Sequence, residues 1–271
     1  YLLDSEVLKN IIIGKPEKLV EEDAKIKLFP LNELIKYIIL KYIFNYNNFK
    51  EKTREYGAYE LAKGLDVRTC LYCNRQYTFT IIKRVEDKIT RPEFDHFFSQ
   101  KEHPALALSF YNLIPSCKIC NSTLKGTEEI TLDKYLHPYF DDFGNGGVFR
   151  YLPLGDNLDY TKSKDYLPYL DISGEKATLI NNHNNLFRLE EIYKNHSDIV
   201  EGIINKSRIY TKDYINSLKS AYSAEFGSYT TKDIYLMIFC NYLYEEDYSK
   251  RVLSKFTHDI VMDTPVLKDM F

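Results

Sequence analysis

The sequence contains no tryptophan, only three methionines, and no apolar run of the roughly 18–20 residues that a membrane-spanning helix needs. The stretch that comes closest, 35–44, is interrupted by Lys36 and Lys41. Nothing in the sequence resembles a signal peptide. These absences argue against a helical membrane protein and a secreted one, so we expect an intracellular, cytoplasmic protein.

An overall excess of positive charge is also lacking, because 36 Lys and Arg residues face 39 Asp and Glu residues, for a net charge of −3. The charge is nevertheless uneven along the chain. Residues 66–125 carry nine basic and six acidic side chains, whereas residues 128–175 carry four basic and ten acidic ones. The local basic excess fits a polyanionic partner, although it would fit many other surfaces equally well.

The remaining composition is that of an ordinary globular protein, with 44% hydrophobic and 28% charged residues among 271. This length allows one large domain or two small ones. Shifts in composition predict three ranges: an N-terminal helical arm over 1–65, a central domain with a loop-rich extension over 66–180, and a C-terminal helical region over 181–271.

Hydrophobic spacing predicts the secondary structure of the first half. Apolar residues three and four positions apart indicate an amphipathic helix over 31–43, and a second helix is expected over 47–63, with Gly64 capping its end. Residues 77–82 are rich in β-branched and aromatic side chains and predict a strand, with a return strand over 89–94.

The second half predicts a mixed α+β fold. We expect short helical turns over 104–110, an extended segment at 112–114, and a helix beginning near Cys120. Loops with short strands are expected over 137–175, and helices follow at about 186–204, 209–222, 231–244 and 248–262.

Four of the five cysteines form two C-x-x-C pairs, Cys70/Cys73 and Cys117/Cys120, separated by 43 residues. An intracellular chain is not expected to hold a disulfide framework, and two such pairs suit the tetrahedral thiolate site that zinc prefers. The zinc would be structural, because four thiolates leave no position open for water. The fifth, Cys240, lies in an apolar run and is expected to be a buried structural thiol.

Other interpretations of these cysteines are a redox C-x-x-C motif or unlinked buried thiols. The repetition of the pair favours zinc. Closing so long a loop would pin the segment between the two pairs, which contains Asp95 and His96.

The order of residues in this segment resembles a known pattern. A C-x-x-C pair is followed by Asp95-His96, by Asn112-Leu113, and by a C-x-x-C pair whose last cysteine precedes Asn121, with Lys125 four residues further on. This order resembles the HNH endonuclease family, and the resemblance covers residues 70–125. It implies a central ββα-metal (HNH) core that is held together by a zinc site of four cysteines. The third letter of the motif is Asn121 instead of histidine, a familiar variant in that family.

The resemblance also implies roles for individual residues. His96 would be the general base that takes a proton from water, and Asn112 would fix the loop that orients it. Asp95 and Asn121 would bind a catalytic divalent ion, for which their oxygen ligands suit Mg²⁺ or Mn²⁺. The substrate would be DNA or RNA, whose phosphodiester bonds the protein would hydrolyse.

Three further residues are candidates for the same site. Glu93 lies two positions before Asp95 on a predicted strand, so both side chains point to one face and Glu93 could reach the metal or its waters. Lys125 and Arg75 are candidates for contact with phosphate.

Residues 112–117 and 253–260 are similar to segments of bacterial HNH proteins from anti-phage defence systems, among them the Septu PtuB-like nucleases. This weaker similarity implies a defence role and a partner ATPase of the ABC type, for which the helical regions at both ends offer docking surfaces.

Two other functions compete with the nuclease. A zinc-stapled module could bind nucleic acid or protein without cleaving, although it would have no need for Asp95, His96 and Asn121 together. A zinc hydrolase of another substrate is disfavoured, because all four thiolates are committed to closing the zinc site.

Overall fold

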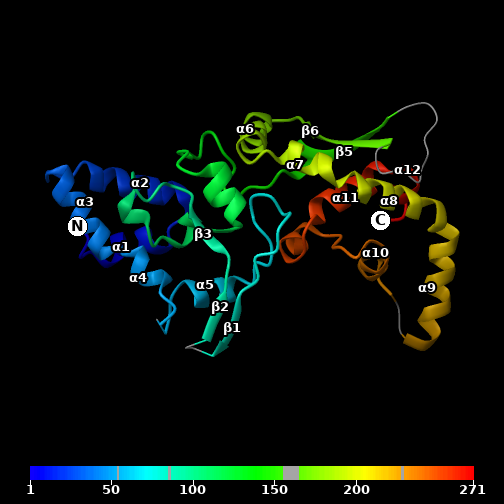
Figure 1. Ribbon diagram of the computed structural model, residues 1–271, viewed down its shortest axis with the longest axis horizontal. Helices are drawn as coiled ribbons and strands as arrows, with labels where there is room; N and C mark the ends of the chain where they lie inside the picture. Colours follow the sequence, from blue (N-terminus) through cyan, green and yellow to red (C-terminus); the bar gives the residue numbers. More distant parts are fainter. Residues whose placement is uncertain (54, 85–86, 155–164, 227–228) are drawn as a thin grey trace. The chain divides into compact units, whose positions relative to one another are not determined.

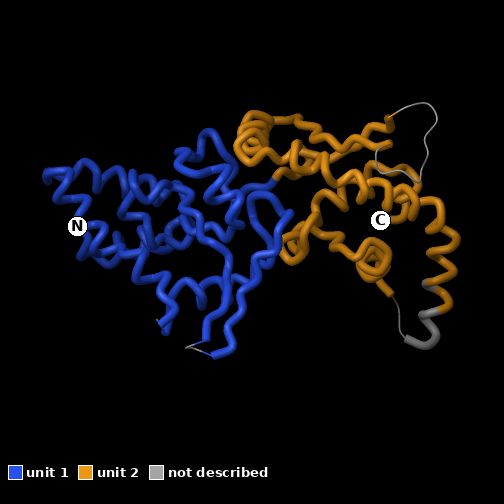
Figure 2. The backbone as a smooth tube through the Cα atoms, viewed as in Figure 1, with its two compact units in different colours: residues 1–142 blue, residues 143–271 orange. Residues whose placement is uncertain are grey.

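The computed structural model describes residues 1–53, 55–84, 87–154, 165–226 and 229–271. The chain folds as a mixture of helices and small antiparallel sheets, which agrees with the predicted α+β class. It divides into two compact units, residues 1–142 and 143–271 (Figure 2). The three ranges expected from composition stay a prediction, because compactness does not show which ranges fold on their own. Within the described residues, no helix combines the length and apolar character needed to cross a membrane.

Within its described residues, unit 1 combines five helices with two strand pairs and three short helical segments (Figure 1). Its helices are α1 (Ser5–Ile13), α2 (Pro16–Lys27), α3 (Glu33–Ile43), α4 (Tyr46–Lys50) and α5 (Ala58–Leu65). Its strands are β1 (Ile81–Arg84), β2 (Asp87–Thr90), β3 (Glu93–His96) and β4 (Leu113–Ser116). Two 3₁₀ segments, Pro104–Leu106 and Phe110–Asn112, and a π-helix, Ile119–Lys125, complete the unit.

The helix predicted over 47–63 is wrong, because two short helices, α4 and α5, occupy this range. A new N-terminus forms at Gly57, whose backbone N–H donates to the Glu60 carboxylate at 3.0 Å, and this cap starts α5. Gly64 lies inside α5 and does not cap it. The residue after the helix is Asp66, which takes the left-handed conformation with φ of 47°.

The strands of unit 1 form two separate antiparallel pairs, β1–β2 and β3–β4. The predicted strand over 77–82 begins late, at Ile81, and Tyr77 makes only an isolated bridge to Thr69. The predicted return strand over 89–94 is divided between β2 and β3. Pro92 lies at this division and has no N–H to donate to a ladder.

The β3–β4 pair and the π-helix form a strand–strand–helix unit that carries most of the candidate site residues. Asp95 lies opposite Ile114 and His96 opposite Leu113 in the antiparallel register. Phe94 and Leu113 pack against Ala58 and Ala62 of α5, so an apolar core supports one face of the pair. The other face meets the π-helix, which ends at Lys125 and is followed by Gly126 with a φ of 53°.

Unit 2 is built on a long antiparallel strand pair with some of its helices packed against it (Figure 1). This pair joins β5 (Gly147–Pro153) and β6 (Tyr166–Ile172). The helices are α6 (Ala177–Phe187), α7 (Leu189–Tyr193), α8 (Ser197–Ile209), α9 (Lys212–Phe226), α10 (Thr231–Phe239), α11 (Ser254–Asp263) and α12 (Pro265–Lys268), with 3₁₀ segments Gly144–Gly146, Lys194–His196 and Glu245–Lys250. Phe149, Tyr193 and Phe256 join strand and helices in one aromatic cluster, with ring centroids 4.4–5.4 Å apart.

Cys240 is exposed, and the prediction of a buried thiol is therefore wrong. The helix α10 ends at Phe239, and Cys240 takes the left-handed conformation with φ of 53°. The chain turns at this residue, so its side chain leaves the apolar face that the preceding residues of the helix share.

Candidate functional site

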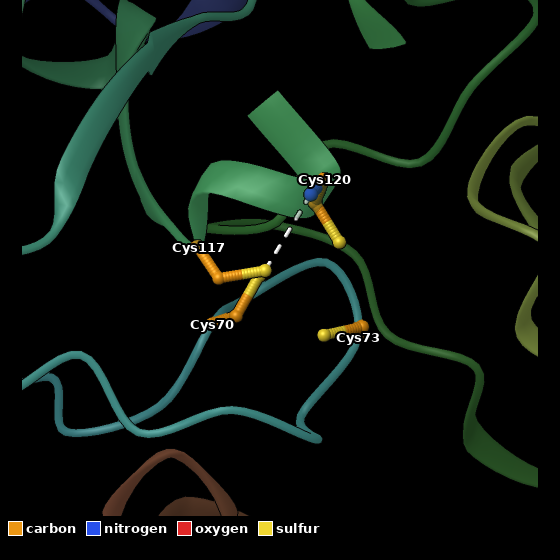
Figure 3. Close-up of side chains that lie close together, drawn as sticks. All are labelled: Cys70, Cys73, Cys117 and Cys120. Carbon is orange, nitrogen blue, oxygen red and sulfur yellow. Dashed lines mark hydrogen bonds between the residues drawn. The ribbon is translucent and has the colours of Figure 1, made fainter. Parts of the chain in front are cut away.

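The four paired cysteines meet in one buried cluster. Their Sγ atoms all lie within 4.8 Å of one another, and Figure 3 shows the four side chains converging from two separate chain segments. A tetrahedral zinc ion binds thiolates at about 2.3 Å, which requires sulfur atoms grouped in this way. The cluster can therefore hold a metal such as zinc. Among the described residues, no other group of three or more His, Cys, Asp or Glu side chains has this arrangement.

Backbone hydrogen bonds shape the two cysteine knuckles, which are the turns at residues 70–73 and 117–120. In the first, Asn74 N–H donates to the Cys70 carbonyl at 2.8 Å, and Asn74 has a positive φ of 46°. In the second, Cys120 N–H donates to Cys117 Sγ at 3.5 Å (Figure 3). Leu71 N–H donates to the Pro115 carbonyl at 3.2 Å, which joins the first knuckle to the strand that leads into the second.

The buried thiols affect one another's protonation. Burial raises the pKa of Cys70 well above its usual value. Hydrogen bonds from Cys120, Cys70 and Cys73 lower the pKa of Cys117. Hydrogen bonds with the other three thiols leave the pKa of Cys73 below its usual value as well. Two thiols of the group thus favour the thiolate form, which is the form that binds a metal.

Asp95 lies on the face of β3 that meets the π-helix and has partners on both carboxylate oxygens. Tyr72 donates its hydroxyl hydrogen to Oδ2 at 2.6 Å, and Lys125 Nζ lies 2.9 Å from Oδ1. Lys125 also donates to the His96 carbonyl at 2.6 Å. Burial and the neighbouring Asp95 charge raise the pKa of Tyr72 well above its usual value, so this hydroxyl stays protonated and donates.

Glu93 and Asn121 form a second polar pair beside Asp95. The Asn121 amide nitrogen donates to Glu93 Oε2 at 2.8 Å, and Ser122 donates to the same oxygen at 3.3 Å. Donation through the amide nitrogen leaves the Asn121 amide oxygen as a ligand for a cation. The structure thus brings Glu93, Asp95 and Asn121 to the interface of β3 and the π-helix.

His96 ends β3 and is held in one orientation. Its Nε2 lies 3.0 Å from the Ala107 carbonyl, and the Tyr46 ring packs edge-on against the imidazole at 4.5 Å. Because a carbonyl only accepts, Nε2 carries the hydrogen and Nδ1 carries the lone pair. Burial lowers the pKa of His96 below its usual value, so the imidazole is neutral at neutral pH. A neutral imidazole with a basic Nδ1 can accept a proton from water.

Asn112 closes the loop between His96 and β4. It is completely buried. Its amide oxygen accepts from Phe98 N–H at 2.6 Å, and its amide nitrogen donates to the carbonyls of Phe98 and Leu106. Leu106 immediately precedes Ala107, so Asn112 holds the segment that orients His96.

We expect Asn112→Ala to lower the free energy of unfolding by about 3 kcal/mol, because each buried group left unpaired costs about 1–3 kcal/mol. Chemical denaturation measures this change. Asn121→Ala is the matched control: Asn121 is half-buried and makes one side-chain hydrogen bond, so a loss below about 1 kcal/mol is expected. Equal losses in the two variants would contradict the assigned role of Asn112.

The two basic candidates have different surroundings. Lys125 was expected to contact phosphate, but its ammonium is buried and bonded within the protein, and only 5% of the residue is exposed. Arg75 is half-buried next to the first knuckle. Its Nε atom is buried and makes no hydrogen bond within the part of the chain that the structure describes.

Sequence reasoning did not identify Tyr72 and Tyr46, which touch Asp95 and His96 respectively. Tyr72 lies between the two cysteines of the first knuckle, and this position is the only feature of the sequence that could have indicated a role for it. Tyr46 lies 50 positions before His96. Its contact depends on how α4 packs, which no local pattern reveals.

A comparison with curated proteins finds a distant relative. The chain is 29% identical over 99 residues to the Septu protein PtuB of Bacillus thuringiensis, and the alignment covers 36% of this chain and 35% of the relative. The chain thus matches about a third of the length of that curated protein. No family model and no solved structure matches the chain. The similarity supports a relation to defence-system proteins.

Proposed function

We propose that the chain is a metal-dependent endonuclease of the HNH type that hydrolyses phosphodiester bonds in DNA or RNA. The observation that carries this proposal is the setting of His96. A neutral imidazole, fixed by the Ala107 carbonyl, ends a strand whose two neighbouring polar side chains, Glu93 and Asp95, face a helix that begins at a cysteine knuckle. This combination provides a general base directly after residues whose oxygen atoms can hold a cation.

The residues present fit two metals with different tasks. The four thiolates suit a closed structural zinc site. The oxygen atoms of Glu93, Asp95 and Asn121 suit Mg²⁺ or Mn²⁺. Glu93 and Asn121 fit such an ion better than Asp95, because both oxygens of Asp95 already accept hydrogen bonds. A divalent ion held there would stabilise negative charge on the leaving oxygen.

The hydrogen bond between His96 Nε2 and the Ala107 carbonyl determines which nitrogen of the ring can take a proton. Nδ1 takes a proton from a water molecule, and the resulting hydroxide oxygen attacks the phosphorus atom. The bond from phosphorus to the leaving oxygen breaks, the leaving oxygen takes a proton from solvent water, and the nucleic-acid strand is cleaved. The Ala107 carbonyl stabilises the imidazolium formed, because it already accepts the Nε2 hydrogen.

We propose that Lys125 is a positioning residue and not a phosphate ligand. Its ammonium joins the Asp95 carboxylate to the His96 carbonyl, so it fixes two adjacent residues of β3 from the last turn of the π-helix. Arg75 is the better candidate for phosphate contact, because its side chain is only half-buried whereas the Lys125 ammonium is enclosed by the protein.

We further propose that the protein acts in anti-phage defence together with a partner ATPase of the ABC type. The distant similarity to the Septu protein PtuB supports the defence role. The partner rests on the resemblance to PtuB-like nucleases. The net charge of −3 gives the isolated chain little overall attraction to a polyanion, which fits a protein that a partner brings to its substrate.

The direct test is cleavage of a supercoiled plasmid and of a single-stranded RNA by the purified chain, with and without the partner ATPase. We expect strand breaks in Mg²⁺ or Mn²⁺ and none in EDTA. Asn121→Ala should raise the Mn²⁺ concentration for half-maximal cleavage by about tenfold or more. Its neighbour Ser122→Ala removes a hydrogen bond to the same Glu93 oxygen and serves as the control with little change. Absence of cleavage under every condition would overturn the proposal.

A zinc-stapled binding module is the competing proposal. The observation in its favour is the state of Asp95, whose carboxylate is neutralised by Lys125 and bonded to Tyr72 without any added ion. Such a module would bind nucleic acid with an affinity that Mg²⁺ and EDTA do not alter, and it would leave the substrate intact.

A further inference from the structure

Two aromatic rings lie on the surface directly after the first cysteine knuckle. Tyr77 and Phe79 are 46% and 47% exposed, and their rings stack with centroids 4.7 Å apart and planes 17° from parallel. Thr78, between them, is 8% exposed, so the chain alternates and turns both rings to one side. Stacking on each other leaves the outer ring faces open to a further flat group.

The zinc knuckle supports this ring pair. Thr78 N–H donates to the Arg68 carbonyl at 2.8 Å, and Cys70 N–H donates to the Gln76 carbonyl at 2.9 Å. Tyr77 also forms the isolated bridge with Thr69. The rings thus stand on a segment that runs beside the cysteine cluster, and this support holds them in place before any ligand arrives.

The sequence of the segment that carries the rings contains charge of one sign. Residues 67–84 contain four basic side chains, Arg68, Arg75, Lys83 and Arg84, and no acidic one. Arg68 pairs with Asp66, whereas Lys83 and Arg84 are exposed on β1. Exposed rings interleaved with cations suit a ligand that has flat apolar groups on an anionic backbone, and nucleic acid has this chemistry.

We propose that Tyr77 and Phe79 form a stacking platform for unpaired bases of the nucleic-acid substrate, while Arg75, Lys83 and Arg84 contact its phosphates. The platform rests on the proposed nuclease function and names its substrate class, a single-stranded segment. Base faces inside a duplex are covered by neighbouring bases, so only unpaired bases can stack on protein rings. The aromatic pair therefore selects single-stranded over fully paired nucleic acid.

The test measures the affinity of the protein for a short labelled single strand and for a blunt duplex by fluorescence anisotropy. All variants carry His96→Ala, which prevents cleavage. Removing both rings, Tyr77→Ala with Phe79→Ala, should weaken single-strand binding by about tenfold or more, since each stacked base contributes strongly. Duplex affinity and the slope of affinity against salt should stay unchanged, because no charge is lost. Tyr77→Trp should retain single-strand binding.

Two controls separate stacking from other effects. Tyr42→Ala with Tyr56→Ala removes two rings that are 82% and 69% exposed elsewhere in unit 1 and should leave both affinities unchanged. Lys83→Ala should weaken the binding of both ligands and lower the slope of affinity against salt by about 0.7–0.9. Unchanged single-strand affinity in the double ring variant, or an equal loss for the duplex, would overturn the platform.

Plasmid cleavage by protein that retains His96 distinguishes the two proposals. If the protein cleaves the plasmid and removal of both rings leaves single-strand affinity unchanged, the platform is refuted and the nuclease proposal stands. Binding through the rings without any cleavage would support the platform as a binding site and refute the nuclease.

Discussion

Replacing His96 with alanine is expected to lower the rate of phosphodiester cleavage by about 10²- to 10⁴-fold, the usual contribution of a general base. The fold and the zinc content should survive, because the imidazole lies at the end of β3 and its hydrogen bond joins only the Ala107 carbonyl. Single-turnover cleavage of plasmid in Mn²⁺ measures the rate, and circular dichroism and metal content verify the fold.

His96→Gln is the sharper variant. A glutamine amide can still donate to the Ala107 carbonyl, but it has no nitrogen basic enough to take a proton from water. If His96 merely holds the loop, glutamine should restore cleavage. If His96 is the base, the glutamine variant should be as slow as the alanine variant. A wild-type rate in either variant would refute the assigned mechanism.

Loss of one cysteine of the cluster is expected to have the largest effect on stability. Cys117→Ser should reduce zinc from one ion per chain to almost none and lower the free energy of unfolding by several kcal/mol, because structural zinc contributes folding energy directly. Cleavage should be lost as well, since the two knuckles bound the segment that carries His96. Metal analysis and chemical denaturation measure both changes.

Cys240→Ser is the matched control for this prediction. Cys240 is the only cysteine outside the cluster, and it is exposed. We expect the same zinc content as the unaltered protein and a change in unfolding free energy within about 0.5 kcal/mol. A Cys117→Ser variant that behaves like Cys240→Ser would show that the thiolates do not hold a structural metal.

The sequence allowed the cysteine cluster and part of its surroundings to be predicted. Two C-x-x-C pairs have few chemical uses together, and the structure brings all four sulfur atoms into one group. The period of two along a strand placed Glu93 and Asp95 on one face, and both contact side chains of the π-helix. These patterns are local, so they can be read from residue order alone.

The interactions of Asp95 could not be predicted in this way. Its partners, Tyr72 and Lys125, lie 23 and 30 positions away, and only the packing of the knuckle and the π-helix brings them together. Lysine after a C-x-x-C-Asn motif indicated a phosphate contact, but residue order does not reveal that the Lys125 ammonium is buried against the Asp95 carboxylate. The break between α4 and α5 was missed because a cap formed by Glu60 outweighs the helical pattern around it.

The assignment of two metals to two sites is the central claim, and one measurement on a single sample tests it most directly. Zinc-loaded protein is freed of other divalent ions, and zinc content and single-turnover cleavage are then determined before and after addition of Mg²⁺. We expect one zinc ion per chain throughout, no cleavage without Mg²⁺, and cleavage after its addition. Full cleavage by the zinc-loaded protein alone, or loss of zinc with cleavage intact, would contradict the account.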